Sequence, residues 1–233
     1  ASVEEKLQGT DEFGEAWQIY VYRLKDGARA SLGQGRLTAA SLIKLYIMGA
    51  VYSSYDNIAA ANGQEQVDKL LNAMITVSDN DSANTLVGML GNGDNAAGQE
   101  AVNTYCKNNG YTDTSMGRML LEKASANENY TSARDCSVFL KNIYENKLEH
   151  SEDMLNLLKQ QTRTEKIPKG IPSGVETANK TGELDHVEND AAIVFDGENP
   201  YIICVMADNL SDTTEARQRI VDISSVVYEN ISK

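Results

Sequence analysis

The pattern of hydrophobic and polar positions changes twice along the chain. The first part alternates and is rich in strand formers, with the turn residues Lys25-Asp26-Gly27 between two predicted strands at 15–24 and 29–32. Apolar residues then recur at helical spacing in five stretches, at 64–77, 82–90, 98–108, 131–145 and 151–161. Strand patterns return at 175–180, 191–195 and 201–207, and a closing amphipathic helix is predicted at 213–231.

Strands at both ends with helices between them predict an α+β fold, in which the two chain ends form one antiparallel sheet flanked by helices. We expect a single domain in which residues 1–36 and 166–233 form the part with the sheet. Residues 37–165 should then form an inserted all-helical part. A cleft where the two parts meet is the natural place for a binding site.

Residues 37–51 are predicted to form a buried helix. Lys44 is the one charged residue between Arg36 and Asp56, so this helix is apolar on nearly every face. Positions i and i+3 share a helix face, which puts the Ser41 hydroxyl beside the Lys44 amine. Burial lowers the pKa of a lysine, so Lys44 could take a proton from Ser41 and make it a nucleophile. In the alternative, Lys44 reaches solvent and Ser41 only caps the helix.

Composition excludes several classes of function. The 233 residues are 41% hydrophobic and 24% charged, which is ordinary for a globular protein. The net charge of −13 argues against nucleic acid or an anionic membrane as a partner, because either needs a basic patch. Three scattered cysteines and two histidines fit neither a disulfide framework nor a metal site, so we expect no metal and no cofactor.

Two further short motifs fall where a cleft would need them. Ser78-Asp79-Asn80 lies between two predicted helices, where the Ser78 hydroxyl could relay a proton and the Asn80 amide could hold a substrate amide. Lys180-Thr181-Gly182 lies on a predicted strand, where a lysine and a threonine can bind a carboxylate. Taken alone, the first motif could be an ordinary helix cap and the second an ordinary strand edge.

The joint occurrence of the three motifs is far more specific. S-x-x-K, S-D-N and K-T-G in this order are the signature of class A β-lactamases and penicillin-binding proteins. The chain resembles the class A serine β-lactamases from about Trp17 to its last helix. The similarity includes Gly49-Ala50-Val51, Ile167-Pro168 and the stretch 188–194.

The resemblance implies an acyl-transfer mechanism without a metal or cofactor. Ser41 would attack the β-lactam carbonyl, Lys44 would act as its base, and Ser78 would pass the proton to the leaving nitrogen. The backbone N–H groups of Ser41 and Glu183 would form the oxyanion hole. The resemblance also implies the residues that bind substrate, with the carboxylate on Lys180 and Thr181, close backbone approach at Gly182, and the side-chain amide on Asn80.

The chain departs from the family in the loop that controls hydrolysis. The family carries E-x-x-L-N there, with a glutamate that activates the deacylating water. Residues 118–132 form a shorter loop without this pattern, and Glu122 and Glu128 are the candidates for that role. Residues 57–63 also replace a longer excursion beside the cleft. We therefore expect a more open pocket that controls water less closely.

Three hypotheses about function follow. The first is a class A β-lactam hydrolase, and the second is a relative that acylates but turns over slowly, such as a D-Ala-D-Ala peptidase, a transpeptidase-like protein or an esterase. The third is a binder of peptidoglycan or β-lactam without catalysis, against which the intact Ser41, Lys44, Ser78 and Lys180 argue. We expect a monomer without a membrane span. Substrates of this kind would place it outside the cytoplasmic membrane, although the first residues are not a signal peptide.

Overall fold

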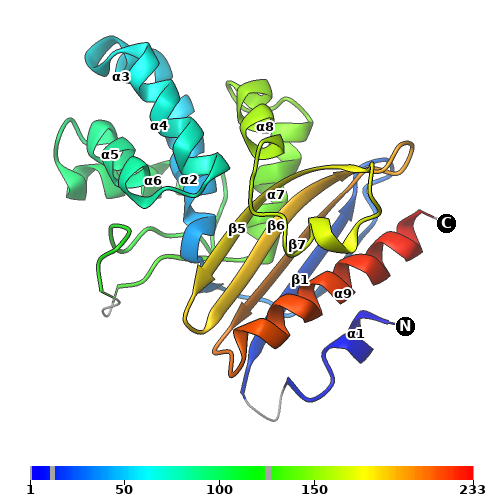
Figure 1. Ribbon diagram of the computed structural model, residues 1–233. Coiled ribbons are helices and arrows are strands. Elements are labelled where there is room, and N and C mark those ends of the chain that lie inside the picture. The colour runs from blue at the N-terminus through cyan, green and yellow to red at the C-terminus, as the bar shows by residue number, and fades with distance from the viewer. Residues whose placement is uncertain (1, 11–13, 124–126, 233) are drawn as a thin grey trace.

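The computed structural model describes residues 2–10, 14–123 and 127–232 and has an α+β fold (Figure 1). One five-stranded antiparallel sheet has the order β2-β1-β7-β6-β5. Its strands are β1 (Ala16–Arg23), β2 (Arg29–Leu32), β5 (Glu176–Leu184), β6 (Val187–Phe195) and β7 (Tyr201–Asp208). Because β1 pairs with β7 along its whole length, the two chain ends form one sheet, as the sequence predicted.

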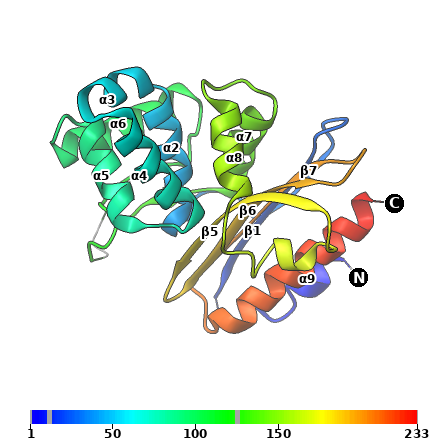
Figure 2. The same ribbon diagram turned by 45° about the horizontal axis from the view of Figure 1, so that its top comes forward.

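Helices cover both faces of the sheet (Figures 1 and 2). One face carries α9 (Thr213–Ile231), with α1 (Val3–Lys6) packed on it, and the 3-10 helix η3 (Pro168–Gly170). The other face carries α7 (Ala133–Tyr144), which packs on β7, β1 and β6. Alternate residues of β6 and β7 therefore enter two different hydrophobic clusters, and this explains why both strands are apolar almost throughout.

The remaining helices form a group beside the edge strand β5. They are α2 (Ile43–Tyr52), α3 (Tyr55–Asn62), α4 (Gln64–Thr76), α5 (Asn80–Leu90), α6 (Asn95–Asn108) and α8 (Ser151–Lys159). All ten residues of α2 are buried, as its uniform apolar pattern predicted. The boundaries of the two parts that we expected at residues 36 and 166 stay a prediction.

The structure differs from the predicted elements where polar residues interrupt the hydrophobic pattern. β5 and β6 extend beyond the predicted strands, and Thr181 pairs with Asp190 in the extension. Both residues are polar but buried, so the hydrophobic pattern did not mark this part of the strands. Ser41 lies in the short 3-10 helix η2 (Ala40–Leu42) that leads into α2. Helix α3 and the small sheet of β3 (Leu37–Thr38) and β4 (Tyr130–Thr131) were not predicted. No helix among the described residues is long and apolar enough to cross a membrane.

Candidate active site

Ser41 and Lys44 meet at the start of the buried helix. The Lys44 Nζ lies 3.2 Å from the Ser41 Oγ, as expected for positions three residues apart. Lys44 is fully buried, so it does not reach solvent, whereas Ser41 is half-buried. Ala40, directly before Ser41, has a φ of +46°, which is strained for a residue with a side chain. The backbone thus turns sharply where Ser41 faces the site.

The second motif supplies three more oxygen atoms to Lys44. Its Nζ lies 3.1 Å from the Ser78 Oγ, 2.6 Å from the Ser78 backbone oxygen and 2.7 Å from the Asn80 Oδ1. Asp79 caps α5 by accepting a hydrogen bond from the Ser82 backbone N–H. The cap fixes the first turn of α5, and Ser78 precedes it with a φ of +62°. The S-D-N motif is therefore both a helix cap and a part of the site.

The number of protons on Lys44 decides what the cluster can do. Four oxygen atoms surround its nitrogen, but the carbonyl oxygens of Ser78 and Asn80 can only accept hydrogen bonds. A neutral amine has two protons for these two acceptors, and its lone pair is left for a hydroxyl. The hydroxyls of Ser41 and Ser78 are the two groups that can donate to it. Neutral Lys44 is therefore oriented as a base toward these serines.

Electrostatics favour this neutral form. The pKa of Lys44 is lowered to about 8, mainly by burial; the charge of Asp79 opposes the shift and that of Arg163 adds to it. Lys180 is also fully buried, and burial together with Lys44 and Arg163 lowers its pKa well below the usual range. Three basic side chains thus share one site, and an anionic group bound there would favour the protonated forms of the two lysines.

Lys180 links the third motif to the second. Its Nζ donates to the Ser78 Oγ at 2.9 Å and to the Thr181 backbone oxygen at 2.8 Å. The Ser78 hydroxyl therefore lies between two lysines and within reach of both. Thr181 itself is buried beside it. The structure thus brings Ser41, Lys44, Ser78, Asn80 and Lys180 together in one hydrogen-bonded cluster.

Gly182 lets strand β5 approach the Ser41 segment closely. A β-carbon at this position would lie 2.9 Å from the Ala39 backbone oxygen and 3.1 Å from the Ser41 backbone nitrogen. Contacts this short exclude any larger residue unless the backbone moves. The next residue, Glu183, ties its carboxylate to Lys166 at 3.2 Å and to Arg163 at 3.3 Å.

The loop glutamates make their contacts within the loop. The Glu122 carboxylate accepts a hydrogen bond from the Met119 backbone N–H at 3.1 Å. The Glu128 carboxylate accepts from the Arg118 Nε at 2.8 Å and from the Asn129 backbone N–H at 2.7 Å. The structure does not bring either carboxylate into the cluster around Lys44. Residues 124–126 of this loop lie outside the described part of the chain.

Sequence reasoning missed three residues that support the site. The Asn189 Nδ2 donates to the backbone oxygens of Thr38 and Ala39, so β6 holds the segment before Ser41. The Asn84 side chain pairs with both backbone groups of Leu120 and fastens the loop to α5. Arg163 acts on the pKa of both lysines from the segment before η3. Asn189 lies in the stretch 188–194 that carries the family resemblance, but no local pattern assigns a role to any of the three residues, because only tertiary structure brings them to the site.

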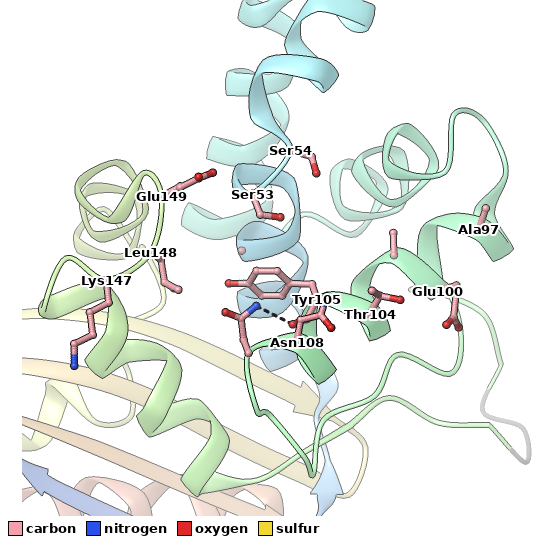
Figure 3. Close-up of a pocket in the computed structure, with 13 residues that line it drawn as sticks. Ser53, Ser54, Ala97, Glu100, Thr104, Tyr105, Asn108, Lys147, Leu148 and Glu149 are labelled. Carbon is pink, nitrogen blue, oxygen red and sulfur yellow. Dashed lines mark hydrogen bonds between the residues drawn. The ribbon is translucent and has the colours of Figure 1, made fainter.

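A pocket of about 690 Å³ lies away from this cluster (Figure 3). It opens between α2, α6 and the segment after α7, and Tyr105 lies over its floor beside Gly49. Its lining includes Ser53 at the far end of α2, and no residue of the Lys44 cluster. This pocket is therefore not the catalytic cleft.

Solved structures with the same fold support the assignment of its class. A β-lactamase from Sphaerobacter thermophilus has 22% identity and a TM-score of 0.83, with 99% of this chain and 97% of that chain covered. PBP-A has 22% identity and a TM-score of 0.81, with 93% and 89% covered. A class A β-lactamase variant of the last common ancestor of Gram-negative bacteria has 20% identity and a TM-score of 0.83, with 98% and 97% covered. These likenesses define a protein with the class A β-lactamase fold.

A sequence profile described as the Beta-lactamase enzyme family matches residues 60–231. The matched range contains Ser78 and Lys180 and begins after Lys44. Because it covers most of the chain, the protein belongs to this family of β-lactamase enzymes, and its fold is that of the class A type. A comparison with curated proteins finds no match.

Proposed function

We propose that the protein opens the ring of β-lactams through an acyl-enzyme on Ser41. The observation that carries this proposal is the buried amine of Lys44, which contacts the hydroxyls of both Ser41 and Ser78. A protein that only binds its ligand has no need of a nucleophile paired with a buried base. A PBP-A mutant of the same fold is described as an acyl-enzyme complex with penicillin G, which makes β-lactams the first substrates to test.

The acylation step follows from the contacts of Lys44. Its neutral amine takes the proton of the Ser41 hydroxyl while the Ser41 oxygen attacks the lactam carbonyl carbon. The lactam C–N bond then breaks, and the Ser78 hydroxyl gives its proton to the leaving nitrogen. Ser78 recovers a proton from Lys44, which returns to its neutral form. The Ser41 and Glu183 backbone N–H groups receive the oxyanion; such a donor is typically worth about 3 kcal/mol of barrier.

Three side chains would hold the substrate during this step. We assign the substrate carboxylate to Lys180 and Thr181, where an anion would favour the protonated lysine. The substrate side-chain amide goes to Asn80, whose oxygen is bound by Lys44 in the structure. All these groups come from one chain, so we propose that a monomer is active. Because β-lactams act on cell-wall synthesis, we propose that the protein acts outside the cytoplasmic membrane.

A second candidate function is favoured by the contacts in the loop. If Glu122 and Glu128 serve to hold the loop together, no loop carboxylate activates the deacylating water. The protein would then be an acylase with slow turnover, related in activity to D-Ala-D-Ala peptidases or esterases. The two candidates share the Ser41 acyl-enzyme and differ only in its lifetime.

Intact-protein mass spectrometry after addition of benzylpenicillin distinguishes the candidates, with absorbance followed in parallel. A transient adduct while the drug is consumed supports the hydrolase, and a persistent adduct supports slow turnover. Ser41→Ala should form no adduct, and undiminished labelling of this variant would overturn the assignment of the nucleophile. No adduct and no turnover with the unmodified protein would contradict both candidates.

A further inference from the structure

A second hollow, of about 380 Å³, lies at the far end of α2. It is bordered by the end of α2 and by α3, α4 and α8. Tyr52, the last residue of α2, lines it and follows Lys44 by eight residues. Eight residues span roughly 12 Å along a helix axis. The lining contains no residue of the Lys44 cluster, so a ligand bound here would leave Ser41 accessible.

Three aromatic rings from three different segments meet in this hollow. The ring centroids of Tyr52 and Tyr55 are 5.5 Å apart, and the His150 ring lies 5.0 Å from the first and 4.9 Å from the second. His150 directly precedes α8 and has a φ of +59°, a conformation that few residues with side chains adopt. Tyr52 is buried and stacks on both Tyr55 and His150, whereas Tyr55 is half-buried and His150 is exposed, so a ligand would meet the outward faces of these last two rings.

The hollow is also acidic. Asp68 accepts a hydrogen bond from the Tyr55 hydroxyl, and Asp153 lies 2.9 Å from the His150 Nδ1. Neither lysine nor arginine lines the hollow, and its other polar groups are amides. Burial and then the hydrogen bond and charge of Asp68 raise the pKa of Tyr55 to about 12. Burial and both carboxylates raise the pKa of Tyr52 as well. The field inside the hollow is therefore negative.

We propose that this hollow is a binding site for an organic ammonium group, such as a trimethylammonium head. The faces of aromatic rings attract cations, and nearby carboxylates neutralise the charge while the methyl groups contact the rings and Leu157. A small metal ion would gain nothing from the rings. A sugar could also stack on the same rings and donate hydroxyl hydrogen bonds to the two carboxylates, but as a neutral ligand it would not compensate their charge. This inference does not depend on the proposed function of Ser41.

The test is a titration of the full chain with choline at pH 8, followed by NMR of the protein. The control ligand is 3,3-dimethylbutan-1-ol, which has the same shape as choline without its charge, and sodium chloride matches the ionic strength. We expect choline to bind at least about fivefold more tightly than the neutral alcohol. The tyrosine signals of the platform should shift with choline concentration.

Variants locate the binding. Asp68→Asn removes one charge but keeps the shape of the side chain, and it should weaken choline binding about fivefold. Tyr55→Leu should weaken it further by removing one ring. Asp56→Asn, at an exposed position of α3 outside the lining, is the matched control and should bind as the unmodified protein does. Thermal unfolding and labelling by penicillin should be unchanged in Asp68→Asn, which separates loss of the site from loss of the fold.

Three results would overturn the proposal. Equal affinity for choline and the neutral alcohol would mean that the hollow binds apolar groups without regard to charge. Binding of a soluble N-acetylglucosamine oligomer in preference to choline would make it a carbohydrate site. Unchanged affinity in both Asp68→Asn and Tyr55→Leu would place any choline binding elsewhere on the protein. Failure of penicillin labelling would contradict the proposed function alone and leave this inference untouched.

Discussion

The Asn80 Oδ1 accepts a hydrogen bond from the Lys44 Nζ at 2.7 Å, so an amide that resembles an ordinary helix cap in the sequence orients the buried lysine. Together with the Ser78 backbone oxygen, it occupies two of the amine's protons. A base in this position needs one free lone pair and a nearby hydroxyl, and the Ser41 Oγ lies 3.2 Å away. The role of Lys44 as a base can therefore be tested by changes to its protonation state.

Lys44→Arg should keep the positive charge and remove the base. A guanidinium stays protonated at any pH that proteins tolerate, so it cannot accept the Ser41 proton. We expect the rate of acylation by benzylpenicillin to fall about 10²- to 10⁴-fold, the usual contribution of a general base. Stopped-flow or quenched mass spectrometry measures this rate. Lys169→Arg, at an exposed lysine in η3, is the control and should acylate normally. Equal rates in the two variants would exclude Lys44 as the base.

Acylation should depend on pH through Lys44. Its pKa is lowered to about 8, so the neutral amine predominates above that pH and becomes scarce below it. The acylation rate should therefore rise about tenfold per pH unit up to pH 8 and then level off. A rate that is flat from pH 6 to pH 9 would contradict the assignment.

The same shift predicts a change in stability. The unfolded chain binds a proton at this lysine up to its usual pKa of 10.5, whereas the folded protein releases it near pH 8. Unfolded chains thus hold more protons in this window, and the free energy of unfolding should rise with pH between 8 and 10.5. Urea unfolding of the unmodified protein and of Lys44→Met at several pH values measures the effect. The Lys44→Met variant should lack the part of the rise that comes from this residue.

Gly182→Ala should separate β5 from the Ser41 segment. The added β-carbon would meet the Ala39 oxygen at 2.9 Å and the Ser41 nitrogen at 3.1 Å, and both partners are backbone atoms. Movement of the strand would part the two proposed oxyanion donors, so we expect at least a tenfold slower acylation. Overpacking should also cost about 1–3 kcal/mol of stability. In Gly88→Ala, the Asn95 side-chain oxygen is the one contact, at 3.3 Å, and acylation should be normal.

Local sequence patterns predict much of the fold and part of the site. The uniform apolar run of α2 predicts its burial, and S-x-x-K predicts the contact between Ser41 and Lys44 because both lie in consecutive helical turns. Local patterns fail where distant segments meet. The Asn189 amide holds the backbone of Thr38 and Ala39, and nothing near it in the sequence identifies that partner. The loop carboxylates likewise gain their partners only in the folded chain.

Glu122→Gln and Glu128→Gln test whether either loop glutamate activates water. Both carboxylates bind groups within the loop, so we expect the lifetime of the penicillin adduct to change less than about twofold in Glu122→Gln. Glu128→Gln removes the ion pair between Glu128 and Arg118, and both of these side chains are about nine-tenths buried. This change should lower stability more than it alters adduct lifetime. A variant that traps the adduct while its unfolding is unchanged would identify the base.

Leu120→Glu should give the loop a carboxylate close to the site. Asn80 and Asn84 are four residues apart in α5 and share a face, so their β-carbons are about 6 Å apart. Asn80 contacts Lys44, and Asn84 holds both backbone groups of Leu120. The backbone of residue 120 is therefore fastened close to the catalytic cluster, whereas the Glu122 and Glu128 carboxylates bind within the loop. In a slowly deacylating protein, a glutamate there should shorten the lifetime of the penicillin adduct at least about tenfold through general base catalysis.

The neighbouring position supplies the control for this variant. Leu121 is 67% exposed, so Leu121→Glu adds the same charge to the loop in solvent and should leave the lifetime unchanged. Time-resolved mass spectrometry of the two adducts measures the difference, and thermal unfolding shows what burial of the new carboxyl at residue 120 costs. Shortening by both variants would mean that loop charge alone speeds hydrolysis. An unchanged lifetime in a folded Leu120→Glu variant would show that residue 120 does not reach the acyl bond, and the water would then have to be activated from the Lys44 side of the cluster.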